Sequence, residues 1–195
     1  MARLPLDVQQ ALKRQLPREL KNKFKKEVDK KFKIIKSEMM KEFLLLPVTQ
    51  ELLQGPDGPN ISGTLGGVTN LFAFIGFDKG DQPVTPIIQL LENTSIQFNK
   101  QLRENNKLGI SYNVNLPTAE EIFAITPMPW AIGRSWAKGI ETGISGLGYL
   151  LRKNSRGRSG SAIQSRVKVR GGKFKNTAYI SAFINKYRKK FRELK

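Results

Sequence analysis

The fold is decided by the segment LKNKFKKEVDKKFKIIKSEMMKEFLLL, Leu20–Leu46. Its apolar residues recur at steps of three or four, which is the period of one helical face. They are Leu20, Phe24, Val28, Phe32, Ile35, Met39, Phe43 and Leu46. Lysines are the commonest residues between them, as on a solvated opposite face. The spacing predicts a helix of about 28 residues, which spans roughly 42 Å at 1.5 Å per residue.

Prolines and glycines on either side of this segment suggest the boundaries. Pro17 fits the first turn of the helix, so we expect residues 6–15 to form a separate short helix. Beyond the helix, Val48–Gln54 adds another turn before a loop rich in glycine and proline. These boundaries predict an N-terminal helical arm, residues 1–54, and a small α+β domain, residues 55–195. A chain of 195 residues can bury a core of this kind.

Shorter segments predict the elements of the small domain. Val68–Phe77 is bounded by glycines and rich in β-branched and aromatic residues, which favours a buried strand. Ser95–Leu102 and Leu108–Leu116 alternate polar and apolar residues and predict a β-hairpin. Short helices are expected at Pro83–Thr94 and at Pro117–Thr126, where a threonine N-cap precedes two glutamates.

The C-terminal third contains an ambiguous segment and a clear helix. Glycines in Trp130–Leu151 disfavour a helix, and the alternation from Trp136 to Thr142 resembles a strand. Thr177 is expected to cap a second amphipathic helix. The apolar face of that helix consists of Ile180, Phe183, Ile184, Tyr187, Phe191 and Leu194. The predicted class is therefore α+β: a small antiparallel sheet with a long N-terminal helix and a shorter C-terminal helix.

The composition argues against several kinds of catalytic and metal site. The chain has no cysteine and no histidine, which removes disulfides, thiolate metal sites, the common zinc sites and any Ser-His-Asp triad. The glycine-rich stretches SGTLGG and GISGLG match neither a phosphate loop nor a dinucleotide fingerprint. The pair Glu120–Glu121 is typical of a helix start rather than of acid–base catalysis. We predict no catalytic residue, no metal, no cofactor and no enzymatic activity.

Positive charge is concentrated near the C-terminus. The formal net charge is +18, and residues 131–195 hold 17 basic and 2 acidic residues. Much of this charge lies in the Gly/Ser-rich loop Lys153–Lys175. Its basic residues are predicted to contact a partner protein or phosphate; they are Lys153, Arg156, Arg158, Arg166, Lys168, Arg170, Lys173 and Lys175. Ile163 and Phe174 are the expected apolar anchors of the loop.

The charge alone leaves the partner open. A basic surface binds nucleic acid through its phosphates, but it binds acidic protein surfaces equally well. Most aromatic residues of the basic third belong to the apolar face of the predicted helix, so few remain for stacking on bases. No helix-turn-helix, zinc-finger or RNA-recognition signature is present. No run of residues is long and apolar enough to predict a membrane span, and the N-terminus lacks the apolar core of a secretory signal.

Several segments resemble virion proteins of tailed bacteriophages. They are PVTQELLQG, NISGTLGGVTNLFAFIGF, MPWAIGRSWAKGIETGISGLGYLL, SRGRSGSAIQ and KNTAYISAFINKYRKKF. More narrowly, they look like the small neck or tail-completion proteins that sit between the portal and the tail. The resemblance covers roughly residues 30–192, and the lysine-rich N-terminal extension departs from it.

The resemblance implies a structural role in the virion. The expected protein is made in the host cytoplasm and forms a homo-oligomeric ring in the head–tail neck. Its partners would be copies of itself, the portal or adaptor on one side and the tail on the other, with possible non-specific contact to packaged DNA and no membrane. Two alternatives stay open: a nucleic-acid-binding accessory protein, and a tail or baseplate component.

Overall fold

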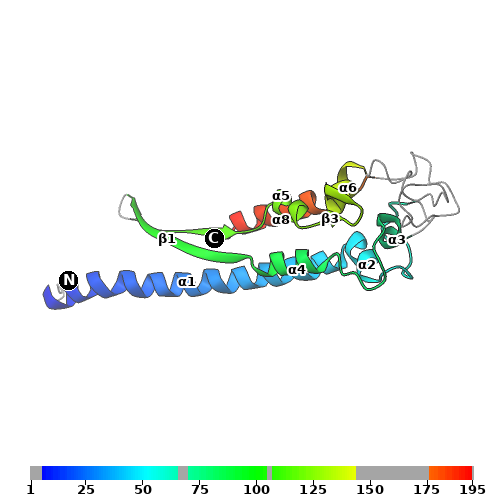
Figure 1. Ribbon diagram of the computed structural model, residues 1–195. Helices are drawn as coiled ribbons and strands as arrows, with labels where there is room; N and C mark the ends of the chain where they lie inside the picture. Colours follow the sequence, from blue (N-terminus) through cyan, green and yellow to red (C-terminus); the bar gives the residue numbers. More distant parts are fainter. Residues whose placement is uncertain (1–5, 66–69, 105–106, 144–175, 195) are drawn as a thin grey trace, which may run out of the picture.

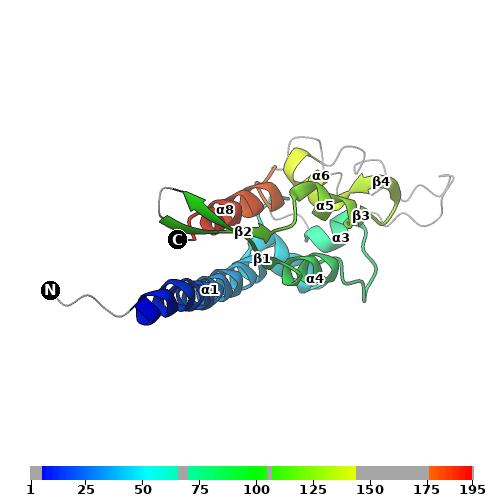
Figure 2. The ribbon, with the colours of Figure 1, turned by 90° about the vertical axis from the view of Figure 1, so that its left-hand side faces the viewer.

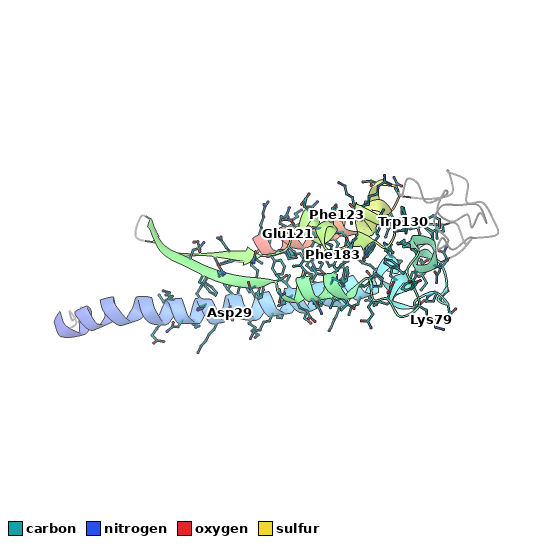
Figure 3. All side chains as sticks on the ribbon, in the orientation of Figure 1. Asp29, Lys79, Glu121, Phe123, Trp130 and Phe183 are labelled. Atoms are coloured by element: carbon teal, nitrogen blue, oxygen red, sulfur yellow. The ribbon has the colours of Figure 1, made fainter. Side chains whose placement is uncertain are left out.

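The computed structural model describes residues 6–65, 70–104, 107–143 and 176–194. These residues form an α+β fold with a long N-terminal helix, a C-terminal helix, shorter helices and two antiparallel sheets of two strands each. The long helix runs along one side of the molecule, and side chains fill the space between it and the other elements (Figures 1 and 3). The predicted fold class is confirmed.

Helix α1, Leu6–Leu45, is a single helix of 40 residues. The expected break at Pro17 is wrong, because the helix continues through this residue. A proline in a helix interior removes one backbone hydrogen bond and crowds the preceding turn. Good helix formers surround Pro17, among them glutamine, leucine, arginine and glutamate, and they favour continuation on both sides.

The core is built where the C-terminal half of α1 meets helix α8, Ile180–Arg192. The Phe32 and Phe191 rings lie 5.4 Å apart between centroids, and Phe43 and Phe183 lie 5.5 Å apart. The predicted apolar face of α8 is confirmed, since all six of its residues are buried. On α1 the predicted face is buried only in part.

Helix α2, Pro47–Leu53, follows α1 directly and carries a buried carboxylate. Glu51 accepts hydrogen bonds from the backbone N–H groups of Ser62 at 2.8 Å and Leu71 at 2.5 Å. These bonds satisfy a charged group that would otherwise be costly to bury. Glu51 therefore ties α2 to the middle of the connection and to the first residue of the next helix.

That next helix, α3 (Leu71–Ile75), overturns the strand predicted for Val68–Phe77. Asn70 caps it by accepting a hydrogen bond from the Ala73 N–H at 2.9 Å. Gly76 ends it in the left-handed conformation, with φ +92°. A short, uniformly apolar segment has no period that distinguishes a strand from a helix. The capping residues at its two ends, Asn70 and Gly76, are what favour the helix.

Helix α4, Thr85–Glu92, lies within the helix expected at Pro83–Thr94. It leads into the main hairpin, which the alternation of polar and apolar residues predicted. Strands β1 (Ser95–Glu104) and β2 (Lys107–Asn115) pair antiparallel. In Figure 1 this hairpin extends toward the same end of the molecule as the N-terminal half of α1. The Lys36 ammonium on α1 donates to the carbonyls of Glu92 at 2.5 Å and Thr94 at 2.8 Å, which ties α1 to the start of the hairpin.

The next short elements are a predicted helix and a hairpin that the sequence analysis did not predict. Helix α5, Ala119–Ala124, begins with the expected Thr118 cap, in a capping box with Glu121. Strands β3 (Pro127–Met128) and β4 (Ala131–Ser135) form a second, unpredicted hairpin.

Helix α6, Trp136–Thr142, replaces the strand-like alternation inferred from the sequence. Trp136, Ala137 and Ile140 are buried together, which is helical spacing. Ser135 caps the helix by accepting a hydrogen bond from the Lys138 N–H at 3.1 Å.

Thr177 does not cap α8. The helix begins at Ile180, and hydrogen-bond donors of its first turn find their acceptor on another element. The Glu141 carboxylate on α6 accepts hydrogen bonds from the Ser181 N–H and hydroxyl, both at 2.6 Å. A carboxylate suits this position because helix N-termini carry unpaired donors and partial positive charge.

Candidate functional site

The residues predicted to contact a partner lie outside the described part of the chain. This holds for all eight basic residues of the loop Lys153–Lys175 and for its anchors, Ile163 and Phe174. Their roles remain predictions. The described residues contain two other surfaces that suit binding: a groove beside β2 and an apolar stripe on α1.

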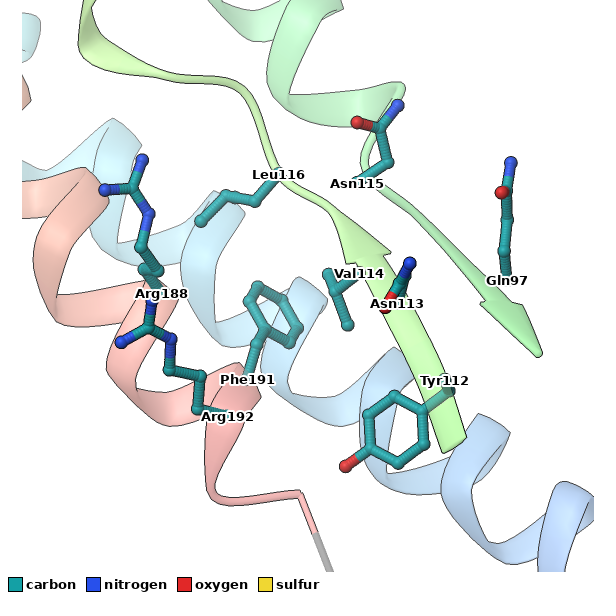
Figure 4. A pocket seen from close by; sticks show the side chains of 9 residues that line it. All are labelled: Gln97, Tyr112, Asn113, Val114, Asn115, Leu116, Arg188, Phe191 and Arg192. Carbon is teal, nitrogen blue, oxygen red and sulfur yellow. The ribbon is translucent and has the colours of Figure 1, made fainter. Parts of the chain in front are cut away.

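The first surface is the β2–α8 groove, a cavity of about 820 Å³ between strand β2 and helix α8 (Figure 4). One wall is the run Tyr112–Leu116 together with Gln97 of β1. The other wall comes from the last turns of α8, where Arg188, Phe191 and Arg192 lie. The groove therefore has strand on one side and basic helix on the other.

The lining combines an apolar part with two cations. Val114 and Leu116 are half-buried and supply apolar surface, whereas Phe191 is only 3% exposed and adds little. No carboxylate is among the lining residues that the structure describes. Arg188 contacts the Asn185 amide oxygen at 3.4 Å, and neither Arg188 nor Arg192 forms an ion pair within the described ranges. Both guanidinium groups are thus available to an anion.

Strand β2 contributes an edge to the groove as well as side chains. Its only hydrogen-bonded strand in the described part of the chain is β1, so its outer edge pairs with no strand there. Successive side chains of a strand point to opposite faces. Consecutive residues from Tyr112 to Leu116 line the groove, so it borders both faces of β2, and Gln97, which pairs with Asn113, extends it to β1.

Helix α8 is held in place by polar contacts with α1. The Lys186 ammonium donates to both Glu42 oxygens, at 2.5 and 2.7 Å, and the Tyr187 hydroxyl donates to the same carboxylate at 2.7 Å. The hydrogen bond from Lys186 lowers the pKa of Glu42. Burial, together with the bond to Glu42, raises the pKa of the Tyr187 hydroxyl.

A contact near the end of the chain closes the groove at its base. The Tyr112 hydroxyl on β2 donates to the Leu194 carbonyl just beyond α8, and burial raises the pKa of this tyrosine. This hydrogen bond joins the strand directly to the end of the helix segment.

The second surface is the N-terminal continuation of the apolar stripe on α1. Val28 is 1% exposed, whereas Phe24 is 38% and Leu20 is 50% exposed. All three belong to the same predicted helical face. The sequence predicts that Phe24 is buried within the subunit or against a neighbour. Its own subunit does not bury it, because the core ends near Val28 while the stripe continues, so burial against a neighbour stays a prediction.

A separate apolar residue stands out on the second hairpin. Ile132 in β4 is fully exposed, next to Gly133 with φ +76°. Single exposed apolar residues are common on protein surfaces, so Ile132 alone does not define a site.

The described residues offer no metal centre: in the ranges the structure describes, no three Asp, Glu, His or Cys side chains gather as ligands. The buried carboxylate of Glu51 is already bonded to two backbone donors, which gives it a structural role. Among the described helices, none is long and apolar enough to cross a bilayer.

Sequence reasoning missed the groove, although part of the signal was present. Arg188 and Arg192 fall in the last turns of α8, where cations also suit the helix dipole. Their spacing of four residues puts them on one face of α8, beside Phe191. What the sequence did not contain was the identity of the element opposite them.

Comparison with known proteins adds no relative: no family model, no curated protein and no solved structure matches this chain.

Proposed function

We propose that this chain is a non-enzymatic structural subunit that assembles with copies of itself, and that it does so as a ring in the head–tail neck of a tailed phage. Portal or adaptor and tail proteins would be its neighbours. The resemblance of its sequence segments to virion neck proteins supports the phage assignment. The observation that carries self-assembly is the uncovered part of the α1 stripe.

The stripe supports assembly because the subunit itself leaves part of this apolar face exposed. Residues 19–27 of α1 are all exposed, yet Leu20 and Phe24 continue the apolar face that is buried from Val28 onward. Burying exposed apolar area yields about 25 cal/mol per Å², so covering this face favours association. A neighbouring copy is the partner that we propose for it.

The arrangement of the projecting elements also supports this proposal. The N-terminal half of α1 and the β1–β2 hairpin both extend from the core toward one end of the molecule (Figures 1 and 2). Extended elements of this kind can reach a neighbouring subunit, which compact binding modules seldom need to do.

The test removes the apolar character of the stripe. In sedimentation of the full chain over a range of concentrations, we expect oligomers for the unmodified protein. The double variant Leu20→Ser/Phe24→Ser should sediment as a monomer at the same concentrations. The control Lys23→Ser/Lys26→Ser changes two exposed residues of the same helix to serine and should keep the oligomers.

Two results would contradict the proposal. Unchanged oligomers in Leu20→Ser/Phe24→Ser would remove the stripe from the interface. A position for the protein away from the neck, in images of the native particle, would remove the phage assignment even if the chain forms rings.

One observation favours a second candidate, a nucleic-acid-binding accessory protein. Residues 131–195 hold 17 basic and 2 acidic residues, and Arg192 and Lys189 of α8 are exposed. This candidate predicts binding that depends steeply on salt.

A further inference from the structure

We propose that the β2–α8 groove binds an extended acidic segment of a partner protein, which adds as a third strand to the outer edge of β2. The proposal concerns a contact separate from the α1 stripe and does not depend on ring formation. Three features of the groove lead to it: the strand edge, the apolar lining and the two arginines.

The strand edge accounts for the extended form of the segment. In a two-stranded antiparallel ribbon, alternate backbone groups of each strand point away from the partner strand. Within the described residues, no backbone hydrogen bond outside the hairpin involves Tyr112–Asn115. Such an edge is a template for another strand, and peptide recognition by strand addition uses it in this way.

The arginines account for the acidic character of the segment. Arg188 and Arg192 line the groove from α8 and have no carboxylate partner in the described ranges. Guanidinium groups bind carboxylates through paired, charge-assisted hydrogen bonds. An acidic segment therefore complements this wall, whereas a basic one would be repelled.

The spacing of the arginines is compatible with an added strand, which the outer edge of β2 favours. Residues four apart on a helix are separated by about 6 Å along its axis, at 1.5 Å per residue. Residues two apart on a strand, whose side chains share a face, are separated by about 6.8 Å. Acidic residues at alternate positions of an added strand would thus meet Arg188 and Arg192 in register. The intervening side chains would point to the other face of the sheet, where Asn113 and Asn115 of β2 lie exposed.

The experiment uses the full chain and a short fluorescent peptide of alternating glutamate and valine. We expect saturable binding by fluorescence anisotropy. Two matched peptides test separately whether binding needs the negative charge and whether it needs backbone pairing. Replacing each glutamate with glutamine removes the charge and should weaken binding. Methylating alternate backbone nitrogens keeps the side chains but blocks strand pairing, and should abolish binding.

Protein variants test the groove itself. Arg188→Gln/Arg192→Gln should weaken binding of the acidic peptide about tenfold, as expected for two partly exposed ion pairs. Lys33→Gln/Lys189→Gln removes the same charge from exposed positions outside the groove. This control should change binding by about twofold at most, because separated surface charges are screened by salt. Peptide binding should also slow hydrogen exchange of the amides of Tyr112–Asn115.

Several outcomes would overturn the proposal. They are absence of saturable peptide binding, equal binding of the N-methylated peptide, and equal weakening by the control variant. Binding of short duplex DNA that depends on Arg188 and Arg192 more than peptide binding does would assign the groove to nucleic acid instead. Because every measurement is made on the free chain, failure here would leave the test of the α1 stripe unaffected.

Discussion

At the scale of single residues, Glu42 shows how charge secures the packing of two helices far apart in the sequence. Its carboxylate accepts hydrogen bonds from Lys186 and Tyr187 across the α1–α8 interface. Lys186 is the main cause of the lowered pKa of Glu42. A carboxyl group whose pKa is lower in the folded state stabilises the fold above its unfolded pKa, and this contribution is lost as pH falls through the folded pKa.

The variant Glu42→Gln tests this linkage. We expect it to lower the free energy of unfolding near pH 7 by about 1 kcal/mol or less, because the pair is partly exposed to water. The difference from the unmodified protein should shrink as pH falls from the ordinary value of 4.5 through the lower pKa of the folded state, below which Glu42 is protonated in both states. Denaturant unfolding at several pH values measures it. A difference that stays constant down to pH values well below 4.5 would show that the charge of Glu42 is not the cause.

At the scale of elements, α3 depends on the residues that bound it. Asn70 caps its start and also donates to the carbonyls of Gly55, Pro56 and Gly58 at 2.7, 2.9 and 3.0 Å. At its end, the Trp130 indole N–H donates to the Ile75 carbonyl at 2.7 Å. The short helix is therefore held by its neighbours, as expected for a helix with too few turns to be stable alone.

Gly76 provides a test of how this end is built. A Cβ at Gly76 would lie 3.2 Å from the Trp130 ring, and φ is +92°. Gly76→Ala should therefore lower the free energy of unfolding by more than the roughly 1 kcal/mol that left-handed strain costs alone. Gly80→Ala is the matched control, since φ is +107° there and nothing lies within 4 Å of the added Cβ. Equal losses in the two variants, measured by thermal or denaturant unfolding, would mean that Trp130 moves aside freely.

At the scale of the whole molecule, charge and shape point to different partners. The basic C-terminal third suits phosphate, whereas the α1 stripe and the edge of β2 suit protein. If the chain is chiefly structural, the full chain should bind random-sequence duplex DNA only weakly near physiological salt, with Kd of about 10⁻⁴–10⁻⁶ M. The affinity should fall steeply as salt rises and should not depend on sequence. Tight, sequence-dependent binding in a salt titration would instead favour the nucleic-acid-binding candidate.

The sequence by itself determined the elements whose signals are local. The helical face from Val28 to Phe43, the hairpin β1–β2 and the capping box at Thr118 each rest on neighbours in the chain, and each is found in the structure. Periodicity and capping act over a few residues, which is why a single sequence reveals them. The sequence also contained the cap at Asn70 and the stop at Gly76, although composition suggested a strand there.

Only the tertiary structure decided the features that need a partner from elsewhere in the chain. The Glu141 carboxylate, 40 residues away, completes the first turn of α8 in place of Thr177. The apolar stripe of α1 is buried only from Val28 onward, because no other described element fully covers Leu20 and Phe24. The groove exists because β2 and α8 are brought together by contacts such as that between Tyr112 and Leu194, which are 82 residues apart. Local patterns carry no information about such distances along the chain, so packing alone set them.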